Sequence, residues 1–358
     1  MSATGRATTF ASPIPHEKER SMAISTRDHY VTFGRREGDE DFPNSLISGI
    51  STFLGARVVP PVREDLEREG VKAGVLGLPW EHTNTCRPGA SYGPRSIRRA
   101  TEHYLSYHGE FQVDLFDALG LADCGDISIV PGNAQRTFER AERCITEIYE
   151  AGAFPIILGG DDSCPIPVTS AMSKLIDGKM GYIQMDSHMD TAADVAGETL
   201  NHACPVSRTC ELPNVDGRNI ALVGINGPLN PRVEREYVDR TGIQMITIWD
   251  IDEWGVDKTI ERILEIAWDG TDGVVLHTDL DVMDQGYTTG VTTPECGGLT
   301  PREVIKMIRA FVRQGVEAYV ITECSSVYDP ANKSARVATR LAMDALGVRA
   351  NPQGTGRV

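Results

Sequence analysis

The sequence predicts an α/β protein with a three-layer α/β/α arrangement and a mainly parallel central sheet. Two observations lead to this prediction. Short apolar runs recur along the chain, and segments whose apolar residues are spaced three or four apart lie between these runs. Because a strand that is apolar along its whole length must be covered on both faces, the alternation favours a parallel sheet between two helical layers.

The predicted strands are the apolar runs themselves. In chain order they span residues 75–78, 154–158, 182–185, 220–225, 245–248, 274–276 and 318–321. The spacing of apolar residues predicts helices around residues 138–148, 260–267 and 304–311. These strands and helices are expected to be joined by right-handed crossovers.

The domain organisation is predicted from composition. Of the 358 residues, 41% are hydrophobic and 24% are charged, which is typical of a globular protein. Residues 1–44 are polar and show neither the strand nor the helix spacing, so we expect a polar N-terminal extension there. No linker rich in proline and serine interrupts the rest of the chain, so residues 45–358 are expected to form a single domain.

Charge and cysteine usage bear on partners and location. The chain has 35 basic and 51 acidic residues, a formal net charge of −16, which disfavours binding to nucleic acid and to anionic membranes. The 8 cysteines include no C-x-x-C pair and are expected to be reduced thiols. No apolar segment resembles a signal peptide or reaches the length of a membrane span. A cytoplasmic protein is therefore expected.

Acidic residues follow three of the predicted strands. In open parallel sheets, catalytic groups collect beyond the carboxyl ends of the strands. Residues two apart in an extended segment point to the same side, so side chains within each of these acidic segments are expected to converge. The segments are Gly-Gly-Asp-Asp-Ser at 159–163, Asp-Ser-His-Met-Asp at 186–190, and His-Thr-Asp-Leu-Asp at 277–281.

Such a concentration of carboxylates indicates a metal site. Without cations, like charges at close range raise carboxyl pKa values and force protonation. A carboxylate-rich set with one imidazole suits Mn²⁺ or Ni²⁺, and bridging aspartates suit a pair of ions. A lone aspartate after a strand is usually a turn or helix cap. The combination of D-x-H-x-D with D-x-D makes the metal site the better interpretation.

A second interpretation applies to residues 274–281. An apolar strand running into D-x-D also resembles the nucleophile strand of a haloacid-dehalogenase-type phosphatase. That interpretation leaves residues 186–190 unexplained, and the nucleophile strand of that family lies near the start of its domain. The dinuclear metal site is therefore preferred.

Further motifs extend the pattern across most of the chain. They are Gly-Ile-Ser-Thr-Phe at 49–53, Arg-Pro-Gly-Ala-Ser-Tyr-Gly-Pro-Arg-Ser-Ile-Arg at 87–98, Thr-Pro-Glu-Cys-Gly-Gly-Leu-Thr at 293–300, and Glu323 after the last long strand. Together with the three acidic segments, the sequence resembles the ureohydrolase family, which includes arginase, agmatinase and related hydrolases of guanidino compounds. The resemblance implies an arginase-like fold.

The resemblance also implies a ligand set. Asp186 and Asp279 would bridge two divalent metal ions, Asp190 would complete the shell of one ion, and His188 and Asp281 would complete that of the other.

The remaining ligand of the family is the histidine of G-G-D-H. Asp162 stands at that position here, and because a carboxylate also ligates Mn²⁺ or Ni²⁺, Asp162 is expected to be the sixth ligand, with an altered metal preference.

The implied reaction is hydrolysis of a guanidino C–N bond. Two cations lower the pKa of a bridging water, so that hydroxide attacks the guanidinium carbon and releases urea or a substituted urea plus an amine or ammonia. By resemblance, Asp190 would orient the hydroxide, His202 would pass a proton to the leaving amine and bind substrate, and Glu323 would pair with the guanidinium.

Two departures bear on the substrate. Ala192 occupies the position at which arginase has an asparagine that holds the amino-acid end of arginine, so arginase activity is disfavoured. The loop at 284–294 lacks two prolines and a glycine of the family pattern, and should follow a different path beside the metals. A small cationic substrate is expected: guanidine, an alkylated guanidine or biguanide, or an agmatine-like compound.

The resemblance implies an oligomer as well. Members of the family commonly form trimers or hexamers, and some pair an active subunit with a degenerate homologue. Because Asp162 replaces a family ligand, an alternative hypothesis is a catalytically weak or inactive partner subunit of a heteromeric ureohydrolase.

Overall fold

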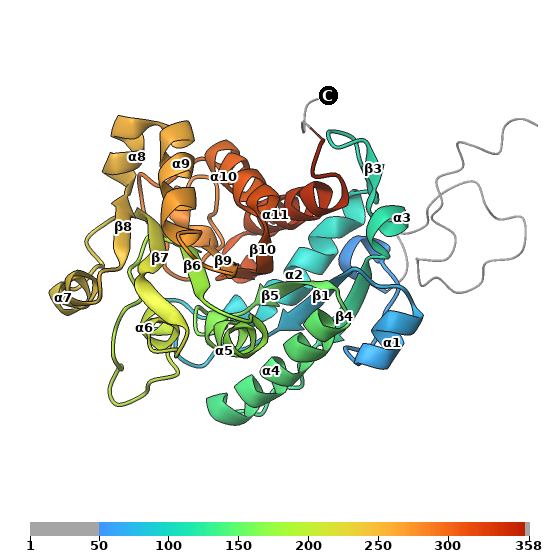
Figure 1. The fold of residues 1–358 in the computed structure, drawn as a ribbon, viewed down its shortest axis with the longest axis horizontal. Coiled ribbons are helices and arrows are strands. Elements are labelled where there is room, and N and C mark those ends of the chain that lie inside the picture. Colours follow the sequence, from blue (N-terminus) through green and yellow to red (C-terminus); the bar gives the residue numbers. More distant parts are fainter. Residues whose placement is uncertain (1–49, 355–358) are drawn as a thin grey trace, which may run out of the picture.

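The computed structural model describes residues 50–354 of the chain. The predicted N-terminal extension over residues 1–44 lies outside the described residues, and the assignment of residues 45–358 to a single domain stays a prediction. The predicted three-layer α/β/α fold is confirmed, with one central sheet and helices on both of its faces (Figure 1).

The central sheet has eight strands, and all neighbouring strands are parallel. They are β1 (Ala73–Leu78), β4 (Ala122–Asp126), β5 (Phe154–Gly159), β6 (Met180–Met185), β7 (Val215–Ile225), β8 (Gln244–Thr247), β9 (Gly273–Asp279) and β10 (Val316–Thr322). Their spatial order is β4-β1-β5-β10-β9-β6-β7-β8, so β5, β10, β9 and β6 lie at the centre. A separate antiparallel pair consists of β2 (Tyr107–His108) and β3 (Val113–Asp114).

The helices form the two outer layers (Figure 1). One layer contains α2 (Gly93–Ala100), α3 (Leu115–Leu119), α8 (Ile248–Trp254), α9 (Val256–Ala267), α10 (Pro301–Gln314) and α11 (Lys333–Ala350). The other contains α1 (Arg63–Arg68), α4 (Ala134–Glu150), α5 (Pro165–Leu175), α6 (Pro205–Cys210) and α7 (Arg232–Thr241).

Local sequence explains where the long helices begin and which face they bury. In α10, Thr300 and Glu303 form a reciprocal capping box and Pro301 occupies the first helical position, where its missing N–H is not needed. In α4, Asn133 caps the first turn and the apolar stripe that includes Phe138 and Ile145 faces the sheet. The predicted helices around 138–148, 260–267 and 304–311 lie within α4, α9 and α10.

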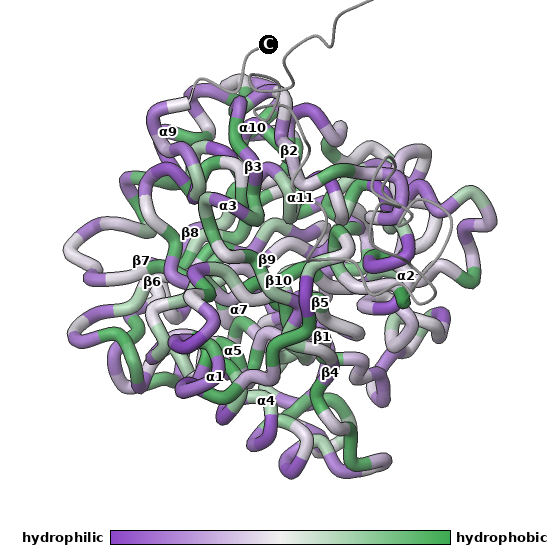
Figure 2. The backbone as a smooth tube through the Cα atoms, turned by 90° about the vertical axis from the view of Figure 1, so that its right-hand side faces the viewer, coloured by the Kyte–Doolittle hydropathy of each residue, from purple (hydrophilic) through white to green (hydrophobic). Residues whose placement is uncertain are grey.

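Two apolar cores lie on opposite faces of the sheet. Along β5, Ile156 and Leu158 belong to the core beneath α9–α11, whereas Ile157 belongs to the core beneath α4 and α5. Figure 2 shows hydrophobic stretches of the backbone tube in the interior and many hydrophilic stretches in the outer loops. Burial on both faces is the reason that the strands are apolar at consecutive positions.

Strand β4 lies at one edge of the sheet and was not among the predicted strands. Its sequence, Ala-Asp-Cys-Gly-Asp, mixes polar with apolar residues, because an edge strand is paired on only one side. The second residue, Asp123, is buried and accepts hydrogen bonds from the Phe53 amide and from Arg98. Strand β4 therefore supplies a buried hydrogen-bond acceptor, and a search for apolar runs does not detect such a strand.

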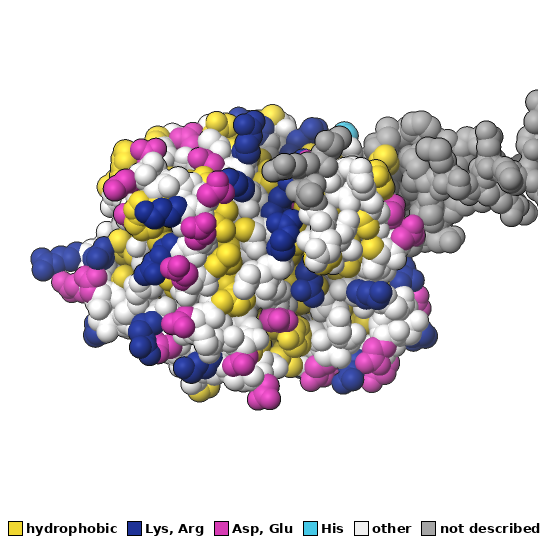
Figure 3. Space-filling view, turned by 45° about the horizontal axis from the view of Figure 1, so that its top comes forward, with side chains coloured by type: hydrophobic (Ala, Val, Ile, Leu, Met, Phe, Trp, Pro, Cys, Tyr) yellow, Lys and Arg dark blue, Asp and Glu magenta, His cyan; other side chains and the backbone are white. Residues whose placement is uncertain are grey.

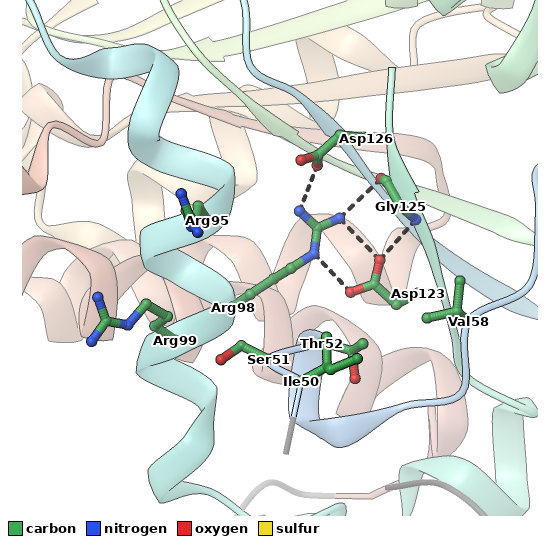
Figure 4. Close-up of a pocket in the computed structure, with 10 residues that line it drawn as sticks. All are labelled: Ile50, Ser51, Thr52, Val58, Arg95, Arg98, Arg99, Asp123, Gly125 and Asp126. Atoms are coloured by element: carbon green, nitrogen blue, oxygen red, sulfur yellow. Dashed lines mark hydrogen bonds and ion pairs between the residues drawn. The ribbon is translucent and has the colours of Figure 1, made fainter. Parts of the chain in front are cut away.

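Arg98 of α2 is the centre of a charge cluster at this edge, in which Arg98 and Asp123 are buried and Asp126 is exposed (Figure 4). Its Nε lies 2.7 Å from Asp123 Oδ2, its Nη1 lies 2.5 Å from Asp126 Oδ1, and its Nη2 donates to the Gly125 carbonyl oxygen at 2.9 Å. Burial acts to lower the pKa of Arg98, but the charges of Asp123 and Asp126 outweigh it and raise that pKa. We call Arg98, Asp123 and Asp126 the arginine cluster.

Candidate metal centre

Residues predicted to bind metal or substrate follow four neighbouring strands at the centre of the sheet. Asp162 follows β5, Glu323 follows β10, Asp279 ends β9, and Asp186 follows β6. These strands are parallel, so their carboxyl ends meet at one edge, and all four side chains are buried. The strand order explains how segments far apart in sequence contribute to one site.

Two groups of buried ligand atoms share one aspartate. Asp186, His188 and Asp281 form one group, and Asp162, Asp186 and Asp279 form the other; within each group the candidate ligand atoms lie within 4.8 Å of one another. Asp186 therefore belongs to both groups, and its role as a bridging ligand stays a prediction. Five of the six predicted ligands are brought together in these groups.

Asp190, the sixth predicted ligand, lies beside these groups without belonging to either. The side-chain amide of Gln184 donates to Asp186 Oδ2 at 2.9 Å and to Asp190 Oδ2 at 3.2 Å. A single amide group therefore holds both carboxylates. This contact places Asp190 next to the shared aspartate.

The predicted reason for convergence, an extended backbone, is wrong. Strand β6 ends at Met185, and the backbone then turns so that the His188 amide donates to Asp186 Oδ1 at 2.6 Å. After β9 a 3₁₀ turn spans Leu280–Val282, in which the Asp281 amide donates to Asp279 Oδ1 at 2.6 Å. Aspartates commonly accept a backbone hydrogen bond from two residues on, and these local turns orient the ligands.

The pKa values of the carboxyl groups show that the cluster lacks internal compensation. Burial first, and then the neighbouring carboxylates, raise the pKa values of Asp186, Asp190, Asp279 and Glu323 well above their ordinary values. Burial acts to lower the pKa of His188, but Asp281 outweighs it and raises that pKa to about 10. The protein alone therefore disfavours the ionised carboxylates, and a bound cation would favour them.

Asp162 differs from the other acids. Burial acts to raise its pKa, but the neighbouring His277 and the Thr322 hydroxyl outweigh burial and lower it. His277 Nε2 lies 3.1 Å from Asp162 Oδ1, and the Thr322 hydroxyl donates to the same oxygen at 2.5 Å. Asp162 is thus held as a carboxylate by two other side chains.

The donor set suits a pair of divalent ions. Asp162 Oδ2, Asp281 Oδ2 and His188 Nε2 are buried and have no hydrogen-bond partner within residues 50–354. Buried polar atoms are normally paired, so unpaired atoms around a shared carboxylate are those expected of metal ligands. Carboxylate oxygens with one imidazole nitrogen match the preferences of Mn²⁺ and Ni²⁺.

A cavity of about 210 Å³ opens beside these ligands. His188 and Asp190 line it together with His202, whose backbone amide donates to Thr83 Oγ1 at 2.9 Å. The His202 Nε2 atom lies 3.4 Å from Thr85 Oγ1, and burial lowers the pKa of this histidine. The predicted loop histidine therefore faces the same space as two predicted ligands.

Glu323 follows β10 in a left-handed backbone conformation, with φ of 64°. Its Oε1 accepts a hydrogen bond from the Asp162 amide at 2.8 Å, and its Oε2 accepts one from the Thr292 hydroxyl. Because a non-glycine residue rarely adopts positive φ, the surrounding structure must hold Glu323 there. Such strain is typical of functional positions.

Comparison with known proteins gives the family. A model described as the Arginase family matches residues 71–347, which is most of the chain. The chain belongs to the arginase family. The resemblance to ureohydrolases is thereby confirmed, and so is the predicted class of enzyme, a hydrolase of amidino C–N bonds.

The similarity between this arginase-family chain and its relatives extends over most of the length of each relative. It is 29% identical to the mitochondrial guanidino acid hydrolase of Homo sapiens, with 78% of each chain covered. It is 27% identical to the mitochondrial agmatinase of Gallus gallus, with 78% of this chain and 82% of the relative covered. The solved proclavaminate amidino hydrolase of Streptomyces clavuligerus is 26% identical, covers 86% of this chain and 99% of its own, and gives a TM-score of 0.76.

Two further expectations concern the cysteines and membrane-spanning segments. The 8 cysteines all lie within the described part of the molecule and are free, as expected of reduced thiols, although Cys86 and Cys296 are exposed. Over residues 50–354 no helix is both long and apolar enough to cross a membrane.

Sequence reasoning missed several residues that support the ligands. Gln184, His277 and Thr322 are fully buried polar residues within otherwise apolar strands. Gln184 lies two residues before Asp186, and His277 lies two residues before Asp279. Alternation along a strand places such residues on the same face as the ligands, and that spacing was the available signal.

Asp161 shows that neighbouring aspartates can have different roles. Its Oδ2 accepts hydrogen bonds from the His82 and Thr83 amides at 3.0 and 3.2 Å, and its Oδ1 accepts from the Ser163 amide at 3.1 Å. Asp161 therefore holds the loop after β1 against the turn after β5. Asp162, the next residue, is left to face the metal centre.

Proposed function

We propose that this chain is a dinuclear metal-dependent hydrolase that cleaves the C–N bond of a small cationic guanidino compound. The observation that carries the proposal is the sharing of Asp186 by two groups of buried ligand atoms, beside a cavity that also contains His202. Asp162, Asp186, Asp190 and Asp279 would hold one ion, and Asp186, His188, Asp279 and Asp281 the other. Either Mn²⁺ or Ni²⁺ suits these ligands.

When bound, the two ions lower the pKa of a water molecule and so supply hydroxide near neutral pH. Asp190 lines the cavity and can accept a hydrogen bond from that nucleophile. His202 lines the same cavity, and because burial lowers its pKa it is neutral near neutral pH. It can therefore accept a proton during attack and return it to the departing nitrogen. The products are urea or a substituted urea and an amine or ammonia.

Glu323 would bind the guanidinium group. Its carboxylate is buried beside Asp162 and is fixed by the Asp162 amide and the Thr292 hydroxyl. A guanidinium and a carboxylate match in charge and in planar geometry, which makes their hydrogen bonds strong and directional. Glu323 would thus orient the carbon that is attacked.

The cavity lining favours a substrate without a carboxylate tail. Among the described residues that line it, none is a lysine or arginine, and the lining includes Glu234 as well as the apolar Val195, Leu229 and Pro231. The carboxylate of a guanidino acid would find no lysine or arginine there. An alkyl group could instead pack against the apolar side chains, and a cationic tail could pair with Glu234. Guanidine, an alkylated guanidine or biguanide, or an agmatine-like compound is therefore the proposed substrate.

The altered loop at 284–294 supports a distinct substrate site. Within it, the Thr292 hydroxyl contacts Glu323 and the Val291 carbonyl oxygen accepts a hydrogen bond from Arg87 at 2.5 Å. Val291 also forms an isolated antiparallel bridge with Cys324, the residue after Glu323. The loop that departs from the family pattern thus lies directly against the proposed guanidinium-binding residue.

A second candidate function is that of a weak or inactive partner subunit. The observation that favours it is Asp162, because the family has a histidine ligand there. Asp162 is itself a ligand-type side chain within a ligand group, so the active enzyme is the preferred hypothesis.

Assembly and location stay proposals. Exposed apolar side chains such as Trp249 and Val233 accord with an oligomer. We propose a homo-oligomer, either a trimer or a hexamer, or a hetero-oligomer with a homologue.

On the face in Figure 3, basic and acidic side chains are interspersed, so that face offers no broad basic surface to nucleic acid. The cytoplasmic location stays a prediction, because the human and chicken relatives are mitochondrial proteins.

The test is metal content measured together with turnover. The chain is expressed alone with Mn²⁺ or Ni²⁺, its metal is measured by mass spectrometry, and urea and ammonia are assayed with guanidine, agmatine, guanidinobutyrate and a dimethylbiguanide. About two metal ions per chain with turnover of a cationic or alkylated compound is the expected result.

Asp186→Ala should abolish turnover with the fold retained. Turnover of guanidinobutyrate alone would contradict the proposed substrate class. No metal and no turnover would favour the partner subunit.

A further inference from the structure

His277 is a fully buried histidine in the middle of the sheet. It lies on β9, and in the register of the sheet it is directly opposite Gln184 of β6 and Val320 of β10. Its Nε2 lies 2.7 Å from Thr322 Oγ1 and 3.1 Å from Asp162 Oδ1. The family resemblance and the proposed mechanism give this residue no role.

Hydrogen-bond donors fix one oxygen of Asp162 and leave the other free. The Thr322 hydroxyl donates its single proton to Asp162 Oδ1, so the Thr322 oxygen is the acceptor for the N–H of His277 Nε2 at 2.7 Å. The same Nε2 atom also lies 3.1 Å from Asp162 Oδ1. Asp162 Oδ2 is buried and has no partner within residues 50–354. The carboxylate is therefore held from behind, with its free oxygen available to the group that contains Asp186 and Asp279.

The other side of His277 contacts the ligands after β6 indirectly. His277 Nδ1 lies 3.2 Å from both the Tyr182 hydroxyl and Gln184 Oε1. The same Gln184 amide donates to Asp186 and Asp190. One imidazole thus joins the support of Asp162 to that of the ligands on the neighbouring strand.

We propose that His277 is a positioning residue that makes Asp162 able to act as a metal ligand in place of a histidine. In many metal sites a carboxylate orients an imidazole ligand from behind. Here the order is reversed, with a carboxylate facing the metal and an imidazole behind it. The two residues act as one unit, because the shorter aspartate needs a donor behind it to fix its orientation. This inference rests on the proposed metal centre.

The first test removes the donor and then restores it. His277→Leu removes both ring nitrogens, whereas His277→Gln retains a side-chain N–H that can reach Asp162. Mn²⁺ binding is followed by titration calorimetry, and retained metal is counted by mass spectrometry after dialysis. His277→Leu should weaken one of two sites by about 10- to 100-fold, and His277→Gln should recover most of that loss.

Tyr319→Phe is the matched control. Tyr319 is also fully buried in the sheet and its hydroxyl donates to Thr278 Oγ1 at 3.3 Å, but it does not contact Asp162. This variant should bind Mn²⁺ as the wild type does. Two sites of unchanged affinity in His277→Leu would overturn the inference alone, whereas a wild type that binds no metal would overturn the proposed function as well.

A residue exchange tests the pairing even if leucine is poorly tolerated. Asp162→His by itself restores the family residue but places two imidazoles against each other, so one site should be lost. Adding His277→Asp gives the new imidazole an acceptor behind it and should restore the second site. If Asp162→His alone binds two ions as tightly as the double variant, the two residues are independent and the inference is wrong.

Discussion

Two charge clusters that contain buried side chains are constructed differently in this molecule. In the arginine cluster, the Arg98 guanidinium bonds to Asp123, to Asp126 and to a backbone carbonyl, so the chain supplies its own cation. In the metal centre, buried acids surround one another and three polar atoms have no hydrogen-bond partner within residues 50–354. The difference is whether the compensating charge is part of the polypeptide.

The pKa shifts express this difference. In the arginine cluster the acids outweigh burial and raise the pKa of Arg98, which means that the ionised form is favoured in the folded protein. In the metal centre burial and neighbouring acids raise the pKa values of Asp186 and Asp279, which means that the ionised form is disfavoured. The first cluster contains its own cation, whereas a cation bound from solution would favour the ionised carboxylates of the second.

A third cluster agrees with the first. Glu110 and Asp344 pair with Arg309 and Arg340 between α10, α11 and the segment after β2. Two acids and two bases compensate each other there. Among these three clusters, the metal centre has the largest excess of acids over bases.

The largest expected effect comes from the shared aspartate. Asp186→Asn should lower turnover by about a thousandfold or more, because a metal pair contributes several kcal/mol to the transition state. The metal-free variant should be no less stable than the metal-free wild type, because one like charge has been removed. Turnover assays and chemical denaturation in a chelator measure the two quantities. A variant that is inactive because it is unfolded would remove the contrast with the arginine cluster.

Removing the internal cation should instead damage the fold. Arg98→Met leaves Asp123 buried without its cation and should lower the free energy of unfolding by about 3 to 5 kcal/mol. Arg99, an exposed neighbour on α2, provides the matched control, and Arg99→Met should have little effect. Denaturant titrations with and without Mn²⁺ measure both variants. Equal losses in the two variants would show that burial of the pair does not matter.

The pH dependence of the metal-free protein should reflect the raised carboxyl pKa values. Above the ordinary aspartate pKa of 3.8 the folded protein binds more protons than the unfolded chain, so the free energy of unfolding should fall as pH rises. Metal at about 100 times its dissociation constant should add about 2.7 kcal/mol per site near neutral pH.

Thermal and denaturant unfolding at several pH values, in chelator and in Mn²⁺, measure this dependence. Arg98→Met should keep the same slope. Metal-free stability that rises over the interval between about pH 4 and pH 8 would contradict the assignment of uncompensated carboxylates.

The smallest effect should come from an exposed ion pair. Arg232 Nε lies 2.9 Å from Glu236 Oε1 on α7, but the Arg232 side chain is 91% exposed. Solvent screens such pairs, so Arg232→Ala should leave the denaturation midpoint unchanged within error. A clear loss of stability would show that pairing alone, without burial, explains the behaviour of Arg98.

The arginine cluster also shows what sequence reasoning overlooked. The apolar runs predicted the inner strands because those strands are buried on both faces, whereas β4 lies at an edge and has a mixed composition. Asp123 and Arg98 carry no spacing signal, since they are 25 residues apart and meet only when α2 packs against β1 and β5. The candidate metal ligands could be picked out in the sequence because they occur in short segments directly after apolar strands.

The sequence by itself determined the class of fold, the family and which acidic residues and histidines follow the central strands. Apolar runs encode strands locally, and an aspartate or histidine that directly follows a strand must lie at its carboxyl end. Only the tertiary structure decided how those ligands are oriented. The turns after β6 and β9, and the contacts of His277 with Asp162, Thr322 and Gln184, depend on strand order and register, which bring together residues that are distant in sequence.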